Sequence, residues 1–169
     1  MGPAIQTIEK QLLAAMATLG QCIKNCPDAD WDQSHGDAPY CQVVFHTLFY
    51  LDFYLSGDEE SFKAQDFHTS HRSFFRDYEE LIDKIPENRY VKPEIDRYFT
   101  FCLGKTHRTL GKMEDDRILD MSGHKGMTYI ELFIYITRHI QHHSAQLGLR
   151  LQQKYGHELD WVSSRGRGD

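Results

Sequence analysis

The histidines are the residues of this chain whose number and spacing could support chemistry. The chain has ten histidines in 169 residues, and three of them lie among apolar neighbours. His139 and His143 are four residues apart in a segment with a helical pattern. Their imidazoles would therefore point the same way from successive helical turns. Two histidines with this spacing can bind one metal ion, as they do in helical zinc sites.

His46 lies in a separate, strongly apolar segment, between Phe45 and Phe49. A third imidazole from this segment would complete a site with three nitrogen ligands and open positions for water or substrate. An H-x-x-x-H pair also arises by chance in a histidine-rich chain, and a lone buried histidine usually makes only a hydrogen bond. Three imidazoles in an apolar interior, however, are costly unless their nitrogens are satisfied, and a shared ion satisfies them. We interpret His46, His139 and His143 as metal ligands.

His142 is an alternative ligand, because it lies three residues after His139. It shares an arc of the helix with Arg138 and Leu149, further from the apolar stripe, so the pair 139 and 143 is favoured. The remaining histidines give weaker signals. His68 and His71 are expected to be exposed at a junction between a loop and a helix, and His124 could reach the site from a glycine-bounded loop.

Gln146 lies one turn beyond His143 on the same stripe. Its side-chain amide could accept a hydrogen bond from an imidazole N–H or bind a water on the metal, which predicts a supporting role. The alternative is an ordinary glutamine on the helix surface. No carboxylate is placed as a general base, because Asp52 is nearly opposite His46 on the helical wheel, and no catalytic residue is identified.

The segments that would carry these histidines are helical. Apolar residues recur with a period near 3.6, and proline, glycine and capping residues bound the segments. Thr128 and Glu131 form a capping box for the last helix, and Gly156 ends it. The segment 59–69 has no clear period and is expected to wrap the surface. The predicted fold is all-α, with four long helices and one shorter helix, spanning about residues 5–26, 39–55, 70–85, 93–113 and 128–155.

Composition narrows the class of protein. Apolar residues make up 40% and charged residues 26% of the chain, which is typical of a single soluble globular domain. The net charge of −6 argues against a nucleic-acid partner. The longest apolar stretches have four or five residues, against the ~20 that a membrane span needs. With no signal peptide, a cytoplasmic protein that does not enter the membrane is expected.

The cysteines and the C-terminal tail carry no predicted chemistry. None of the spacings among the four cysteines is C-x-x-C, so they are expected to be buried apolar residues and not disulfides. Residues 158–169 are rich in glycine and charge and are predicted to be a flexible tail, following a single domain over residues 1–157. The final Arg-Gly-Asp is a very weak adhesion motif.

The segment 138–147, Arg-His-Ile-Gln-His-His-Ser-Ala-Gln-Leu, resembles the C-terminal signature of DinB-like (YfiT-type) proteins. That signature is a His, three residues, a second His, two residues and a Gln followed by an aliphatic residue. His46 falls where the family keeps its first metal ligand, and the order and lengths of the helices match along the whole chain. Ser144 and Ala145 depart from the Arg-Gly of many relatives, which puts any inherited substrate contact in doubt.

The resemblance implies a four-helix bundle of up-down-down-up topology, with a long crossover over residues 59–87 that holds the additional shorter helix. It implies a divalent ion, zinc or nickel, on three histidines at one end of the bundle, and often a homodimer. Family members with assigned activities are metal-dependent thiol transferases and isomerases, and others are suggested to be hydrolases.

Two classes of function remain open on these grounds. The first is an enzyme that activates a thiol or a water at the three-histidine site, with a small-molecule substrate such as a low-molecular-weight thiol and an apolar wall from Phe49, Phe53 and Tyr135. The absence of a placed general base favours the thiol. The second is a non-catalytic, stress-related dimeric protein that binds a metal or a small ligand.

Overall fold

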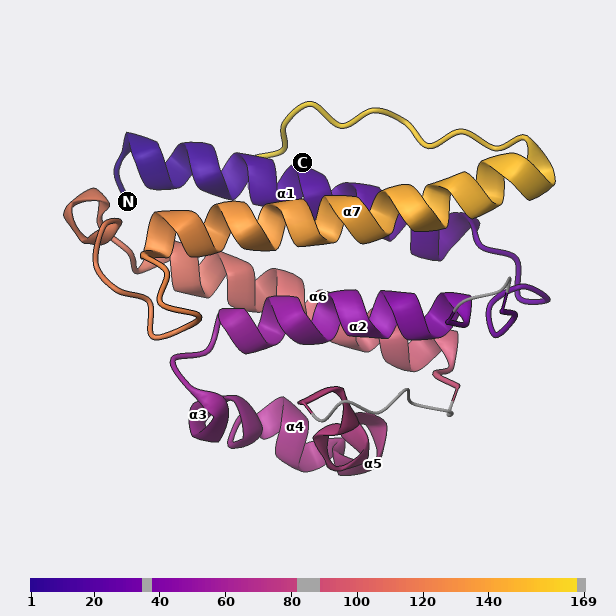
Figure 1. The fold of residues 1–169 in the computed structure, drawn as a ribbon, viewed down its shortest axis with the longest axis horizontal. Coiled ribbons are helices and arrows are strands. Elements are labelled where there is room, and N and C mark those ends of the chain that lie inside the picture. Colours follow the sequence, from indigo (N-terminus) through magenta and orange to yellow (C-terminus); the bar gives the residue numbers. More distant parts are fainter. Residues whose placement is uncertain (35–37, 82–88, 167–169) are drawn as a thin grey trace.

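The computed structural model describes residues 1–34, 38–81 and 89–166. These residues form helices joined by loops, and the one strand-like feature among them is an isolated bridge between Met121 and Thr128. The all-α prediction is therefore confirmed. The four long helices are α1 (Pro3–Asn25), α2 (Tyr40–Tyr54), α6 (Lys92–Gly111) and α7 (Tyr129–Tyr155), as Figure 1 shows.

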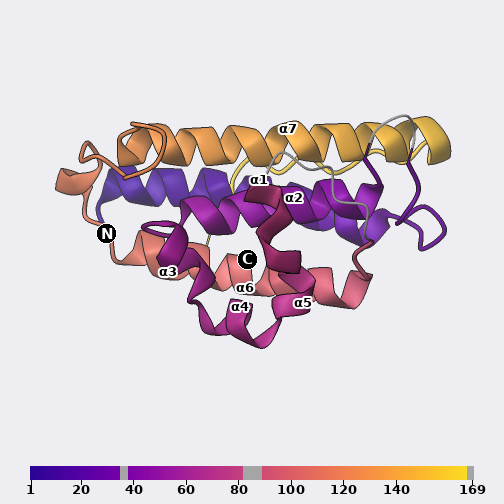
Figure 2. The ribbon, with the colours of Figure 1, turned by 60° about the horizontal axis from the view of Figure 1, so that its bottom comes forward.

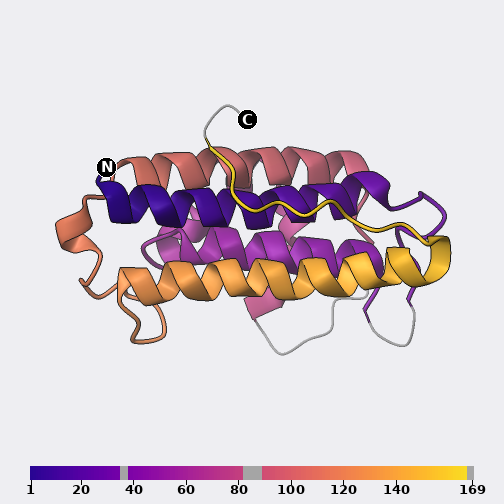
Figure 3. The ribbon, with the colours of Figure 1, turned by 90° about the horizontal axis from the view of Figure 1, so that it is seen from above.

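The four long helices lie alongside one another. Helix α1 packs against α6 and α7, and α2 packs against the same two helices on the other side. Helices α1 and α7 run in one direction and α2 and α6 in the opposite one (Figures 1 and 3). None of the helices in the described part of the chain is long and apolar enough to cross a membrane.

Helix α2 lies at the centre because apolar residues surround almost its whole circumference. Only His46, Tyr50 and Phe53 of this helix are partly exposed; its other residues are buried. Spacings of four and three residues place these three on one face of the helix. The surface of α2 that reaches solvent is therefore narrow, and His46 lies on it.

The ends of α7 follow the sequence signals. Thr128 and Glu131 form the predicted capping box. The backbone N–H and the hydroxyl of Thr128 both donate hydrogen bonds to Glu131 Oε2. Gly156 ends the helix in the left-handed conformation, with φ of 65°, which glycine adopts without steric cost. The helix that carries His139 and His143 is thus fixed at both ends by local chemistry.

The crossover between α2 and α6 differs from the predicted single helix. It contains three short helices, α3 (Glu59–Lys63), α4 (Asp66–Ser70) and α5 (Arg72–Phe75), followed by a 3₁₀ segment, η1 (Arg76–Leu81). They lie beside α2 and α6, away from α1 and α7 (Figures 1 and 2). The prediction of one helix over 70–85 is wrong up to Leu81, and Ile82, Ile85 and the rest of 82–88 lie outside the described residues.

The predicted helix breaks at three consecutive residues with positive φ, Arg76, Asp77 and Tyr78. Left-handed conformations cost about 1–2 kcal/mol per non-glycine residue, so packing must compensate. The Phe75 ring stacks on the His68 ring with centroids 3.8 Å apart, and the Arg76 guanidinium lies 4.2 Å from the centre of the Tyr90 ring. These tertiary contacts override the helical pattern of the segment.

A buried polar cluster joins the crossover to α2 and α6. The Asp52 carboxylate accepts hydrogen bonds from His68 Nε2 at 2.7 Å, Tyr98 Oη at 2.8 Å and Lys105 Nζ at 2.5 Å. Asp52, His68 and Tyr98 are fully buried. Burial alone would raise the pKa of Asp52, but the hydrogen bond from His68 and the charge of Lys105 outweigh it and lower the pKa. The expectation that His68 is exposed is wrong, because this carboxylate holds it in the core.

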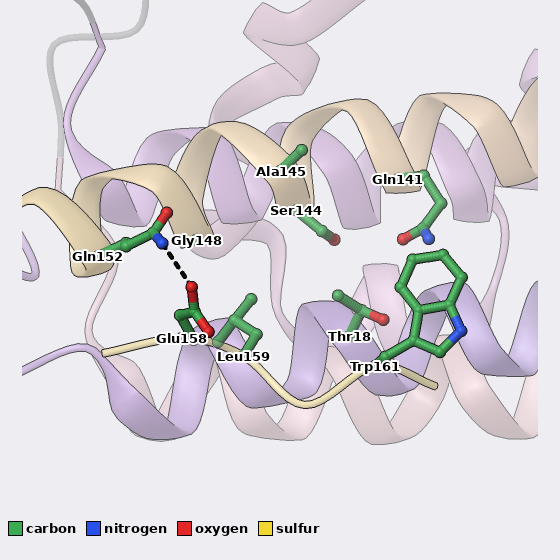
Figure 4. Close-up of a pocket in the computed structure, with 9 residues that line it drawn as sticks. All are labelled: Thr18, Gln141, Ser144, Ala145, Gly148, Gln152, Glu158, Leu159 and Trp161. Carbon is green, nitrogen blue, oxygen red and sulfur yellow. Dashed lines mark hydrogen bonds between the residues drawn. The ribbon is translucent and has the colours of Figure 1, made fainter. Parts of the chain in front are cut away.

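The segment after α7 runs back along α1 in an extended form (Figure 3). The Gln21 side chain bonds the backbone of Asp160 in both directions, at 3.1 and 2.8 Å. Beneath it lies a shallow groove (Figure 4), lined by Thr18, Gln141, Ser144, Ala145, Gly148, Gln152, Glu158, Leu159 and Trp161. The flexible tail over 158–169 stays a prediction, and Arg167, Gly168 and Asp169 lie outside the described residues. All four cysteines are free and buried.

Candidate metal site

The three histidines predicted as ligands come together where α2 and α7 pack side by side. His46 Nε2 lies 3.3 Å from His139 Nε2, and a nitrogen from each of His46, His139 and His143 lies within 4.8 Å of the others. His46 is near the middle of α2, and His139 and His143 are near the middle of α7. The cluster therefore lies along the helices and not at one end, which corrects the placement that the resemblance implied.

The spacing of the nitrogens fits a divalent ion. Zinc–nitrogen bonds of about 2.0–2.1 Å at tetrahedral angles place two ligand nitrogens about 3.3 Å apart, which matches the distance between His46 Nε2 and His139 Nε2. A nitrogen of His143 lies within 4.8 Å of both. In the described part of the chain, this is the one group of three or more potential ligands that lies close enough to share an ion.

The outer nitrogens of two imidazoles are each held by an acceptor. His46 Nδ1 lies 2.9 Å from Glu80 Oε2, and His143 Nδ1 lies 2.8 Å from Gln146 Oε1. A carboxylate and an amide oxygen accept hydrogen bonds, so these contacts favour the tautomer with the proton on Nδ1 and the lone pair on Nε2. For His46 this is the nitrogen that faces His139. Acceptors in these positions orient metal-binding imidazoles in many proteins.

Glu80 is a site residue that the sequence did not reveal. Its side chain is 8% exposed, its Oε1 accepts a hydrogen bond from Gln42 Nε2 at 2.5 Å, and its backbone oxygen accepts one from the Tyr50 hydroxyl at 2.8 Å. The left-handed turn that begins at Arg76 places Glu80 beside α2. Because the segment had the pattern of a helix, no sequence signal could have placed Glu80 beside His46.

Burial keeps the imidazoles of His139 and His143 in the neutral form that binds metals. Burial, followed by the charges of His143 and His46, lowers the pKa of His139 to about 3. Burial also lowers the pKa of His143, against the opposing effect of the hydrogen bond to Gln146. Both rings are thus unprotonated at neutral pH, with lone pairs available to a cation.

Aromatic rings surround the cluster, although not the set that the sequence suggested. Tyr50 meets both His46 and His139 edge-on, and the Tyr135 ring lies nearly parallel to that of His139. Phe49 is fully buried and packs into the core, so its predicted place in the wall of the site is wrong. The rings that contact the histidines are those of Tyr50 and Tyr135, and Phe53 packs against Tyr50.

The other histidines considered as ligands lie outside the cluster. His142 is exposed on the outer side of α7, in agreement with the preference for His139 and His143. His124 is buried, and its Nε2 donates to the backbone oxygen of Ser56 at 2.6 Å. It therefore anchors the loop before α7 and does not join the group of three.

Removing either outer acceptor is expected to weaken metal binding. Glu80→Ala frees the His46 ring to rotate, and Gln146→Ala does the same for His143. Each change is expected to raise the dissociation constant of the ion about 10–100-fold. Isothermal titration with zinc at neutral pH measures it, with Glu79→Ala as the neighbouring control. An unchanged affinity in both variants would show that these contacts do not support the site.

Comparisons with known proteins do not extend this description. No family model matches the chain, and searches of curated proteins and of solved structures find no significant match.

Proposed function

We propose that this chain is a DinB-like metal-binding protein that activates a small thiol at His46, His139 and His143. The observation that carries the proposal is the convergence of three imidazoles on one point, two of them oriented by outer acceptors. A group of neutral nitrogen ligands suits zinc or nickel. A bound divalent ion keeps its positive charge there and lowers the pKa of a thiol or a water.

The arrangement of the long helices supports the DinB-like part of the proposal. Helices α1 and α7 run in one direction and α2 and α6 in the opposite one (Figure 1). A long crossover separates α2 from α6 in the sequence. This agrees with the up-down-down-up four-helix bundle of that family. The homodimer implied by the resemblance is part of the proposal.

The residues around the cluster favour a thiol over a water as the group activated. A free thiol has a pKa of about 8.5, and the pKa of water is far higher, so a water needs more help from a base. Glu80 is the carboxylate that contacts the ligands, and its two oxygens are occupied by His46 and Gln42. Among the described residues, no further carboxylate contacts the three histidines to act as a base for hydrolysis.

The second candidate is a non-catalytic protein that binds a metal or a small ligand. A structural metal site is normally closed by a fourth protein ligand, whereas a catalytic one keeps an open position. Among the described residues the group contains three ligands and no fourth, and the His46 side chain is 34% exposed. Both observations favour a site that a small molecule can reach.

Metal analysis followed by a thiol assay tests the proposal. Freshly purified protein is expected to contain about one divalent ion per chain, and to accelerate the reaction of 2-mercaptoethanol with an aromatic chloride above the rate of a His46→Ala variant. Bound metal without thiol consumption would favour the non-catalytic alternative. Absence of any bound metal, even after incubation with zinc and nickel, would refute both.

A further inference from the structure

A lysine in the loop before α7 is held in an unusual backbone conformation. Lys125 has a φ of 50°, between Gly123 at 83° and Gly126 at 66°. A non-glycine residue pays about 1–2 kcal/mol for this left-handed conformation, so a turn that keeps a lysine there must be stabilised by its surroundings. The sequence showed two glycines in this loop but not the left-handed backbone conformation of the lysine between them.

The turn around Lys125 is anchored on both sides. His124, its neighbour, donates a hydrogen bond to the backbone oxygen of Ser56 at the end of α2, and is 7% exposed. Ser122 Oγ donates to the backbone oxygen of Met127 at 2.8 Å. The loop is therefore tied to the end of α2 by His124 and closed on itself just before α7, and these two helices carry the candidate metal site.

The ammonium of Lys125 lies over aromatic rings next to the site. Its Nζ is 5.8 Å from the centre of the Tyr54 ring and 5.6 Å from that of Tyr135. The Tyr135 ring in turn lies 6.3 Å from the His139 ring, with 15° between the two planes. One aromatic ring thus separates the lysine side chain from a ligand of the proposed ion.

The surroundings of this ammonium leave its charge available to a ligand. Within residues 1–34, 38–81 and 89–166, Lys125 forms no ion pair, and its side chain is exposed to solvent. Glu80, the carboxylate at the cluster, is engaged by His46 and Gln42. A fixed cation beside an accessible site attracts an anionic group of a ligand more strongly than a neutral one.

We propose that Lys125 binds an anionic group, of the carboxylate class, on the small thiol that the three-histidine site takes. This inference rests on the proposed function and adds the charge of the substrate to it. The thiol end would lie at the histidines and the carboxylate end at the Lys125 ammonium, across the Tyr135 ring. The other reading is a surface lysine that only covers two tyrosine rings.

Thiol titrations of the cobalt-loaded protein separate these readings. Cobalt(II) absorption reports thiol binding directly, without any assay of turnover. The probes are 3-mercaptopropionate and its uncharged analogue 3-mercaptopropionamide. Each is titrated into the wild type, Lys125→Ala, Lys125→Gly and Lys125→Arg. Lys125→Gly is included because glycine accepts the positive φ and so preserves the turn. Lys24→Ala, an exposed lysine on α1, is the matched control.

The wild type is expected to bind the carboxylate thiol about 3–10-fold more tightly than the amide, the range of a charge-assisted contact at an exposed position. Lys125→Ala and Lys125→Gly are expected to lose this preference, and Lys125→Arg and Lys24→Ala to keep it. Equal binding of both thiols by the wild type, or a preference that survives in Lys125→Gly, overturns the inference while leaving the metal site intact. Failure to take up cobalt overturns the proposed function itself.

Discussion

A His139→Ala variant is expected to lose specific metal binding. His139 contributes the nitrogen that lies 3.3 Å from His46 Nε2, so its removal leaves two ligands on different helices. Loss of an outer acceptor already costs about 10–100-fold in affinity, and loss of a ligand is expected to cost more than 100-fold. Metal content after dialysis and a competition titration with a chromophoric chelator measure the effect.

The control for His139→Ala is His142→Ala. His142 lies on the same helix, carries the same imidazole and is exposed outside the cluster. Its removal is expected to leave the metal content and the affinity of the wild type unchanged. Retention of the ion by His139→Ala, or its loss from His142→Ala, would show that the ligands have been assigned wrongly.

The site could be predicted from the sequence where its chemistry is local. The pair His139 and His143 follows from helical spacing together with the apolar stripe on that face, and the capping box at Thr128 fixes the start of their helix. His46 followed from the strongly apolar character of its segment, because a segment buried all round must lie in the centre of the fold. Their meeting needed only the packing of two correctly predicted helices.

The contacts of the crossover with the rest of the fold could not be predicted. Phe74, Phe75, Tyr78 and Leu81 have helical spacing, but packing against His68 and Tyr90 favours a left-handed turn instead. Glu80 reaches His46 only because of that turn. The position of His68 likewise depends on a carboxylate in α2, which no local pattern indicates. In each case tertiary contacts override the local pattern, which is where a single sequence carries least information.

An Asp52→Asn variant is expected to be strongly destabilised. The substitution keeps the size of the side chain and removes its charge, which leaves the Lys105 ammonium buried without its partner. Breaking a buried ion pair in this way costs about 3–5 kcal/mol in the free energy of unfolding. Urea denaturation followed by circular dichroism measures it, with Asp96→Asn, at an exposed position of α6, as the control.

The double variant Asp52→Asn with Lys105→Met tells whether the charge pair itself is responsible. Replacing both charges by uncharged groups removes the uncompensated ammonium, so the double variant is expected to recover a large part of the lost stability. Chelation of the metal in the wild type is expected to cost less than Asp52→Asn, because the core and this cluster hold the helices without the ion. If chelation unfolded the protein while Asp52→Asn did not, the ion would be structural. That result would refute the thiol-activating role of the three histidines. The relative size of these two losses therefore decides whether the ion is there for the fold or for chemistry.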